Sequence, residues 1–173
     1  MLEQKKHLIL IGFMGSGKTT LGKRLANQLK MPFVDSDDSI EKRTGIKIEQ
    51  IFETHGESFF RELEKKWLLT LGNLQPSVIA TGGGLPCFDR NLEALKESGK
   101  VFYLQRPARE LAQRLSVSKT NRPLILNLTS EELVQFIEEK IIEREVFYLQ
   151  ADFILDRDEQ MPNVIKKIFT NQD

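Results

Sequence analysis

The 173-residue sequence has little cysteine, little histidine and no net charge. Cys87 is the single cysteine, so no disulfide can form within the chain, which is typical of a reducing cytosol. His7 and His55, expected at the surface or at strand edges, are too few for a Cys/His metal site. Lysines and arginines number 25, as do aspartates and glutamates. Proteins that coat DNA or anionic membranes carry excess positive charge, so we expect neither partner.

Long hydrophobic runs are also absent. The apolar stretch at residues 8–14 follows Lys5 and Lys6, as the apolar part of a secretory signal would. At about seven residues it is too short to span a bilayer, and we assign it to the interior of the fold. The chain length and the 40% hydrophobic content predict one domain, residues 1–173, with a normal core.

Short apolar runs alternate with amphipathic stretches along the chain. Five of these runs have the composition of buried parallel strands: 8–11, 33–34, 78–80, 101–104 and 153–155. Leucines at helical spacing follow the first run, at Leu21, Leu25 and Leu29. This order predicts an α/β fold in which a five-stranded, mostly parallel sheet lies between two layers of helices.

The second half of the chain carries clear helix signals and one interruption. Thr129 and Glu132 form a capping box that should open a long helix, and Pro162 should begin the last helix. The polar segment 116–128 lacks any periodicity and lies between helices. It is either a plain connection or a lid over an active site, since long loops in compact domains are often active-site covers.

Residues 12–19 read Gly-Phe-Met-Gly-Ser-Gly-Lys-Thr and match the G-x-x-x-x-G-K-[ST] pattern between a strand and a helix. In such a loop the backbone N–H groups and the helix N-terminus bind phosphate oxygens. Lys18 would reach the β- and γ-phosphates, and the Thr19 hydroxyl would ligate magnesium. The motif predicts a P-loop NTPase fold whose nucleotide is bound by Gly15, Ser16, Gly17, Lys18, Thr19 and Thr20.

Several motifs of other phosphate-binding proteins are missing. The D-x-x-G and N-K-x-D segments that a GTPase needs do not occur in the sequence. The H-R-D and D-F-G signatures of protein kinases do not occur either. The sequence therefore favours ATP as the nucleotide and a small molecule as the acceptor.

Acids follow the second predicted strand, and three glycines follow the third. Carboxyl ends of parallel strands share one edge, so both groups should face the P-loop. Asp35 could hold magnesium through water, and Asp37 could accept a hydrogen bond from a substrate hydroxyl. The alternative is a helix N-cap, the only role expected of Asp38. The three glycines are Gly82, Gly83 and Gly84. Their backbone amides could approach a ligand closely, or they could form a tight turn.

Three arginines stand out by their positions. Arg144 shares a helical face with Ile137, so it projects from a stripe that should be apolar and needs an anionic partner. Arg61 borders a similar stripe. Arg122, within the possible lid, could close over the phosphates and offset charge that develops during transfer. The alternatives are structural salt bridges for Arg61 and Arg144 and simple solvation for Arg122.

Together these motifs resemble the shikimate kinases, P-loop enzymes related to the nucleoside-monophosphate kinases. The landmarks cover residues 8 to about 168: 12–19, 33–37, Phe60-Arg61-Glu62, 80–84, Arg122-Pro123-Leu124, and Arg144 with Tyr148. The resemblance implies that shikimate is held by Asp37, Arg61, Gly82, Gly83, Gly84 and Arg144. It also implies that Arg122 lies in a lid that contacts ATP, and that Gln160 lies near adenine.

The implied reaction transfers the γ-phosphoryl of MgATP to the 3-hydroxyl of shikimate, a step in aromatic amino acid biosynthesis. Lys18, Asp37 and Arg122 would be the catalytic residues, while Thr19 and Asp35 would bind magnesium. Two alternatives are a related kinase for another small acid such as gluconate, and a regulatory module that binds nucleotide without turnover. We expect a monomeric cytoplasmic enzyme with a cationic pocket and small-molecule partners only.

Overall fold

The computed structural model describes residues 7–118, 125 and 127–170. Its five strands form one sheet in the order β2-β3-β1-β4-β5, and every neighbouring pair is parallel. The strands lie where the sequence predicts them: β1 (His7–Ile11), β2 (Phe33–Asp35), β3 (Val78–Ala80), β4 (Gly99–Leu104) and β5 (Phe153–Leu155). The predicted α/β class and parallel sheet are confirmed.

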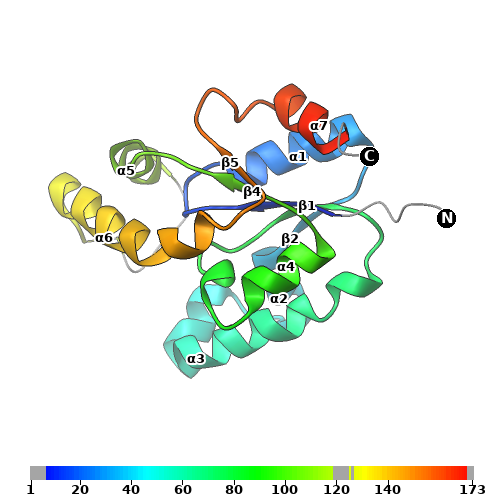
Figure 1. Ribbon diagram of the computed structural model, residues 1–173. Coiled ribbons are helices and arrows are strands. Elements are labelled where there is room, and N and C mark those ends of the chain that lie inside the picture. The colour runs from blue at the N-terminus through cyan, green and yellow to red at the C-terminus, as the bar shows by residue number, and fades with distance from the viewer. Residues whose placement is uncertain (1–6, 119–124, 126, 171–173) are drawn as a thin grey trace.

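Helices cover both faces of this sheet (Figure 1). Helices α1 and α7 lie on one face and α2, α3 and α4 on the other, while α5 and α6 lie beside the end toward which the strands run. The bounds are α1 (Lys18–Leu29), α2 (Ser36–Thr44), α3 (Ile48–Leu68), α4 (Asn91–Ser98), α5 (Ala108–Ser116), α6 (Ser130–Tyr148) and α7 (Pro162–Thr170). Short 3-10 helices also occur, among them η1 (Leu71–Asn73) and η2 (Leu85–Cys87).

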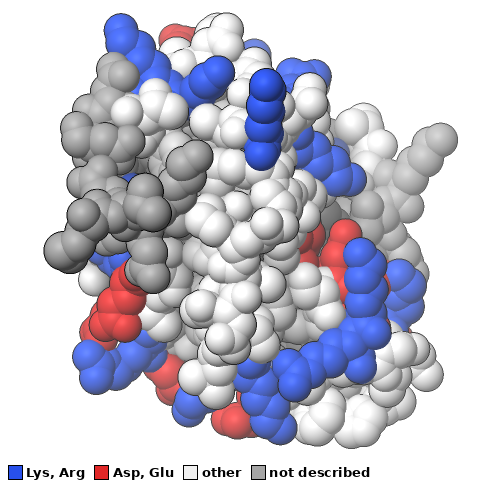
Figure 2. Space-filling model, turned by 90° about the vertical axis from the view of Figure 1, so that its right-hand side faces the viewer, with Lys and Arg blue, Asp and Glu red and all other residues white. Residues whose placement is uncertain are grey.

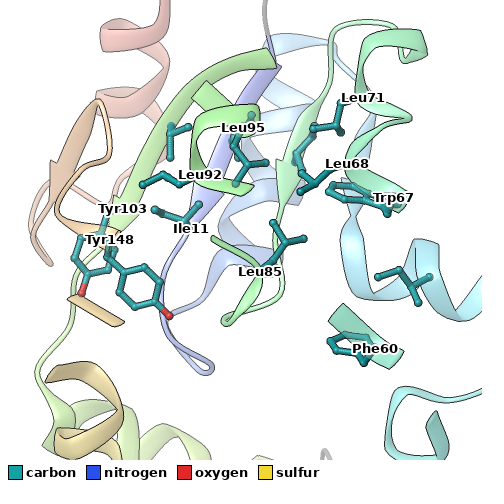
Figure 3. Packing of buried hydrophobic residues seen from close by; sticks show 14 of the residues in the cluster. Ile11, Phe60, Trp67, Leu68, Leu71, Leu85, Leu92, Leu95, Tyr103 and Tyr148 are labelled. Atoms are coloured by element: carbon teal, nitrogen blue, oxygen red, sulfur yellow. The ribbon is translucent and has the colours of Figure 1, made fainter. Parts of the chain in front are cut away.

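The central strand β1 is buried on both faces, which explains its continuous apolar sequence. Leu8 and Leu10 belong to the cluster under α1 and α7. Ile9 and Ile11 point to the opposite face and belong to the cluster under α2, α3 and α4 (Figure 3). All four side chains are fully buried, and each contributes about 1.5–3 kcal/mol relative to an exposed position. The strand therefore fixes the edge at which the P-loop begins.

Helix ends follow the predicted signals. The Thr129 hydroxyl accepts a hydrogen bond from the N–H of Glu132 at 3.2 Å, and Glu132 accepts one from the N–H of Thr129 at 2.7 Å. The predicted capping box at the start of α6 is thereby confirmed. Pro162 begins α7, also as predicted. Helix α3 is kinked at Gly56, whose φ is 79°.

His7, expected at the surface or at a strand edge, is instead buried: it begins the central strand β1 and is only 6% exposed. Its Nδ1 accepts a hydrogen bond from the N–H of Ser77 at 3.0 Å, and its Nε2 lies 3.2 Å from the carbonyl oxygen of Leu71. The ring therefore joins the start of β1 to the segment before β3 and to η1. His55 is exposed, as predicted, and stacks on Phe59 with a centroid distance of 4.6 Å.

Charges of both signs are distributed over the surface. Figure 2 shows acidic and basic side chains around the rim of one face and uncharged residues across its centre. Charged residues make up 29% of the sequence, so its zero net charge reflects a balance and not a scarcity of charge. Among the described helices, none combines the length and the apolar character that a membrane crossing requires.

Candidate active site

The P-loop connects β1 to α1 at the carboxyl edge of the sheet. Gly12, Gly15 and Gly17 have φ values of 142°, 81° and 99°, a region that residues with side chains rarely adopt. The loop path therefore requires glycine at these positions. The Lys18 side chain folds back across the loop and donates hydrogen bonds to the carbonyl oxygens of Gly12 at 2.7 Å and Phe13 at 2.9 Å. Its ammonium is thereby placed over the predicted phosphate cradle.

Thr19 and Asp35 meet although they lie on different elements. The Thr19 hydroxyl donates to Asp35 Oδ2 at 3.0 Å. The other carboxylate oxygen, Oδ1, accepts from the N–H groups of Asp37 at 3.0 Å and Asp38 at 3.5 Å. Asp35, and not Asp38, is therefore the N-cap residue of α2. The exposed Asp38 contributes an acid to the first turn, where the helix dipole favours it.

The pair formed by Thr19 and Asp35 suits a magnesium ion, which prefers hard oxygen ligands. Across residues 7–118, 125 and 127–170, no group of three or more His, Cys, Asp or Glu side chains could hold a metal ion alone. An ion at this position would need water and phosphate oxygens as its other ligands, which is the usual environment of magnesium in kinases.

Asp37 lies against the first of the three glycines. A Cβ on Gly82 would stand 2.5 Å from Asp37 Oδ1, so no larger residue fits there without movement. Buried Ser36 joins the two segments: its hydroxyl donates to Asp37 Oδ1 at 3.3 Å and accepts from the N–H of Gly82 at 2.8 Å. The amide of Gly82 is thus occupied by Ser36, in contrast to the expectation that it faces a ligand.

The carboxyl group of Asp37 is set up to change protonation near neutral pH. Its burial, followed by the nearby charge of Asp35, raises the pKa of Asp37 to about 6, while Lys18 acts in the opposite direction. Perturbed carboxyl groups of this kind are common where a protein must accept or donate a proton.

Arg61 lies against the third glycine. A Cβ on Gly84 would be 2.9 Å from both terminal guanidinium nitrogens, and the guanidinium lies 3.9 Å above the ring centroid of Phe88. The charge is already paired, because Nη1 lies 2.6 Å from Glu64 and Nη2 lies 2.7 Å from Glu57. The alternative of a structural salt bridge therefore holds for Arg61 without excluding a ligand role.

The two carboxylates that pair with Arg61 differ in burial. The side chain of Glu64 is 1% exposed and that of Glu57 is 57% exposed. Burial raises the pKa of Glu64 to about 7, even though Arg61 lowers it. Oxygen Oε1 of Glu64 is buried and has no hydrogen-bond partner among the described residues. Glu64 is thus a fixed partner of Arg61, whereas Glu57 can exchange its contact for water.

Arg144, on α6, lies against the middle glycine. A Cβ on Gly83 would be 3.6 Å from its Nη1, and the guanidinium lies 5.4 Å from the ring centroid of Phe13 in the P-loop. Tyr148, one turn later, donates its hydroxyl to the carbonyl oxygen of Gly83 at 2.6 Å. No carboxylate of the described part of the chain forms an ion pair with Arg144, although the side chain is half-buried.

Three consecutive glycines therefore each face a different predicted shikimate-binding side chain. Gly82 faces Asp37, Gly83 faces Arg144, and Gly84 faces Arg61. Those three side chains come from α2, α6 and α3, and α6 is far in the sequence from the other two helices. The structure brings the whole predicted substrate set together beside the P-loop, since Gly83 also lies near the P-loop atoms Met14 N and Gly12 O.

On the other side of the P-loop, a cavity of about 200 Å³ is lined by Ser16, Gly17, Thr20, Leu21, Arg24, Arg106, Arg114, Gln160 and Pro162. The amide nitrogen of Gln160 donates to the carbonyl oxygens of Gln105 at 2.7 Å and Leu155 at 2.9 Å. Its Oε1 is buried, and no hydrogen-bond partner for it lies in the part of the chain that the structure describes. Gln160 thus lies beside the P-loop, whereas Arg122 and most of the predicted lid, 116–128, lie outside the described residues.

Sequence reasoning missed four contributors to this site. Ser36 and Phe88 gave no separate signal, and Glu64 could have been found from its position three residues after Arg61. Arg106 lines the cavity beside the P-loop and donates from Nε to the carbonyl oxygen of Ser16 at 2.9 Å. Arg106 and Ser16 are 90 positions apart, so no sequence motif contains both.

Known shikimate kinases match this chain along most of its length. The family model described as shikimate kinase matches residues 14–172. A shikimate kinase from Phocaeicola vulgatus is 41% identical over 152 residues, which cover 88% of this chain and 87% of the relative.

Solved structures of shikimate kinases are also similar to this chain. The crystal structure of shikimate kinase from Bacteroides thetaiotaomicron has a TM-score of 0.86 at 36% identity, covering 96% of this chain and 97% of that one. The Acinetobacter baumannii enzyme in complex with shikimate has a TM-score of 0.84 at 34% identity, covering 98% and 96%. A gluconokinase from Sinorhizobium meliloti, at 17% identity and a TM-score of 0.56, shares the fold alone. The chain therefore belongs to the shikimate kinase family.

Proposed function

We propose that this chain transfers the γ-phosphoryl group of MgATP to the 3-hydroxyl of shikimate, giving shikimate 3-phosphate and ADP. The observation that carries the proposal is the row of three glycines that gathers Asp37, Arg144 and Arg61 beside the P-loop. An acid and two arginines match a substrate with hydroxyl groups and one carboxylate. The relative from Acinetobacter baumannii with shikimate bound supports the choice of acceptor.

The two arginines bind the substrate carboxylate. Arg144 is half-buried with no carboxylate partner in the described part of the chain, so a ligand carboxylate supplies the anion that its burial requires. Arg61 keeps the buried Glu64 as its anchor and releases Glu57, whose exposed carboxylate returns to water at little cost. The site is therefore less cationic than the arginines alone indicate, because Glu57 and Glu64 offset Arg61.

Asp37 orients the acceptor hydroxyl and takes its proton. Its pKa of about 6 leaves it mostly ionised at neutral pH, yet basic enough to accept a proton as the oxygen attacks. The new bond joins the acceptor oxygen to the γ-phosphorus, the bond from that phosphorus to ADP breaks, and the bond electrons leave with ADP. Ser36 holds Asp37 in place for this step through their hydrogen bond.

The P-loop binds the nucleotide. Backbone amides of Gly15, Ser16 and Gly17 bind the phosphates, for which the Ser16 amide gives up its 3.2 Å hydrogen bond to the carbonyl oxygen of Phe13. Lys18 moves from the loop carbonyls to the β- and γ-phosphates. Thr20 lines the cavity beside the P-loop. Gln160 lines the same cavity, and we assign it a position near adenine. Arg122 acts from the lid by offsetting charge on the transferring group.

Thr19 and Asp35 would hold magnesium, which when bound neutralises phosphate charge. The Thr19 hydroxyl would supply one ligand directly. Asp35 would act through water from Oδ2, while its Oδ1 remains the N-cap of α2.

The proposal is tested by an ADP-release assay with magnesium and either shikimate or gluconate as acceptor. We expect turnover with shikimate and none with gluconate. Arg144→Ala should raise the KM for shikimate at least tenfold, whereas Arg90→Ala, at an exposed position, should leave it unchanged. Turnover with gluconate alone would identify a different small-acid kinase, and nucleotide binding without any turnover would identify a regulatory module.

A further inference from the structure

Arg106 reaches the P-loop from the segment that follows β4. The side chain is only 12% exposed. Its Nε donates to the carbonyl oxygen of Ser16 at 2.9 Å, and its Nη1 pairs with Glu110 in the first turn of α5. Two edges of one rigid, planar guanidinium are thus fixed, one on the loop and the other on a helix.

The bond to Ser16 determines which way the next amide faces. The carbonyl of Ser16 and the N–H of Gly17 belong to the same planar trans peptide, so the two groups point in opposite directions. A donor that holds the carbonyl on the outer side of the loop directs the N–H toward the inner side, where the phosphates bind. Gly17, with φ of 99° and no side chain, has little conformational preference of its own to hold that orientation.

We propose that Arg106 is a positioning residue for nucleotide binding: it orients the Ser16–Gly17 peptide so that the N–H of Gly17 faces the β-phosphate, and Glu110 holds Arg106 in place. The inference rests on the proposed function, because it assumes that ADP and ATP bind at the P-loop. Arg106 contributes through the loop backbone and not by touching the nucleotide.

Glu110 holds Arg106 in the position from which it binds the loop. Its Oε1 pairs with Arg106 and also lies 3.9 Å from Nη1 of Arg114. Arg114 in turn approaches the loop, since a Cβ on Gly17 would be 3.2 Å from its Nη2. One carboxylate on α5 therefore restrains two arginines that flank the same peptide.

The test compares ADP and adenosine binding, by calorimetry, for the full-length protein and the variants Arg106→Lys, Arg106→Ala and Glu110→Gln. Each variant should raise the Kd for ADP about tenfold, as expected when one charge-assisted hydrogen bond is misaligned. Adenosine lacks phosphates, so its Kd should change less than about twofold. The KM for ATP should rise while the KM for shikimate stays within about twofold of its original value. Arg109→Ala, which removes an exposed arginine of the same helix, is the control and should match the unmodified protein.

The variants separate this role from the alternatives. Direct contact between Arg106 and a phosphate would let Arg106→Lys retain affinity, and Glu110→Gln would leave or improve ADP binding; either result overturns the proposal. Equal losses for adenosine and ADP, or a fall in melting temperature that accounts for the loss, would also overturn it. If the unmodified protein bound no ADP, the proposed function itself would fail, which is a distinct outcome. Combining Arg106→Ala with Glu110→Gln should add little to either single loss.

Discussion

Replacing Asp37 by asparagine should stabilise the protein while removing its activity. The rise in the pKa of Asp37 from 3.8 to about 6 means that the folded protein holds the charged carboxylate less favourably than the unfolded chain does. This rise corresponds to about 3 kcal/mol at pH values above 6. Asparagine has nearly the same shape and carries no charge, so Asp37→Asn removes that cost.

The sign of the pH dependence is fixed by the direction of the shift. Below pH 3.8 the carboxyl group is protonated in both states, and the variant gains nothing. The gain grows as the pH rises through the interval from 3.8 to about 6 and is complete above it. At pH 5 we expect about half of the full value. The stability difference between Asp37→Asn and the unmodified protein should therefore increase between pH 5 and pH 7.5.

Urea unfolding at these two pH values measures the gain, and ADP release with shikimate measures the loss. We expect kcat to fall by about 10²-fold or more, because an amide cannot accept the proton. Asp38→Asn is the matched control, since Asp38 is an exposed acid in the same helical turn. Equal stabilisation by both substitutions, or a gain that does not depend on pH, would refute the reasoning about burial.

Three further outcomes follow from the geometry. Gly82→Ala should lower kcat about tenfold or more, because its Cβ would stand 2.5 Å from Asp37 Oδ1. Gly72→Ala is the control, since open space surrounds Gly72, and it should leave kcat unchanged. Equal rates for the two variants would contradict this prediction. His7→Ala should lower the free energy of unfolding in urea by about 2 kcal/mol, since it leaves a buried N–H and carbonyl unpaired, and His55→Ala by less than about 0.5 kcal/mol. The rate of ADP release should fall as the pH drops through about 6, and Asp37→Asn should lack that dependence.

The sheet and the P-loop could be predicted from sequence because their signals are local. A strand buried on both faces must be apolar at successive positions, and Leu8 to Ile11 satisfy this without reference to the rest of the chain. The P-loop pattern likewise reflects backbone conformations, which Gly12 and Gly17 adopt at positive φ. Both kinds of information lie within a few consecutive residues.

Contacts between distant segments could not be predicted in this way. The burial of His7 depends on Ser77 and Leu71, which are 70 and 64 positions away. A histidine on the central strand carries no mark that both ring nitrogens will find partners. The meeting of Arg61 and Arg144 at neighbouring glycines has the same origin, because it depends on how α3 and α6 pack against the sheet.

Asp35 shows why some predicted alternatives are not exclusive. The sequence offered it as either a magnesium ligand or part of an N-cap, since a carboxylate at the end of β2 suits both roles. A carboxylate has two oxygens, and both are engaged here: Oδ1 caps α2, and Oδ2 accepts a hydrogen bond from the Thr19 hydroxyl, beside which we propose the magnesium ion. The cap fixes the side chain so that Oδ2 stays directed at the P-loop helix. The N-cap of α2 and the proposed magnesium ligand are therefore two roles of one restrained side chain. We expect Asp35→Ala to impair both roles.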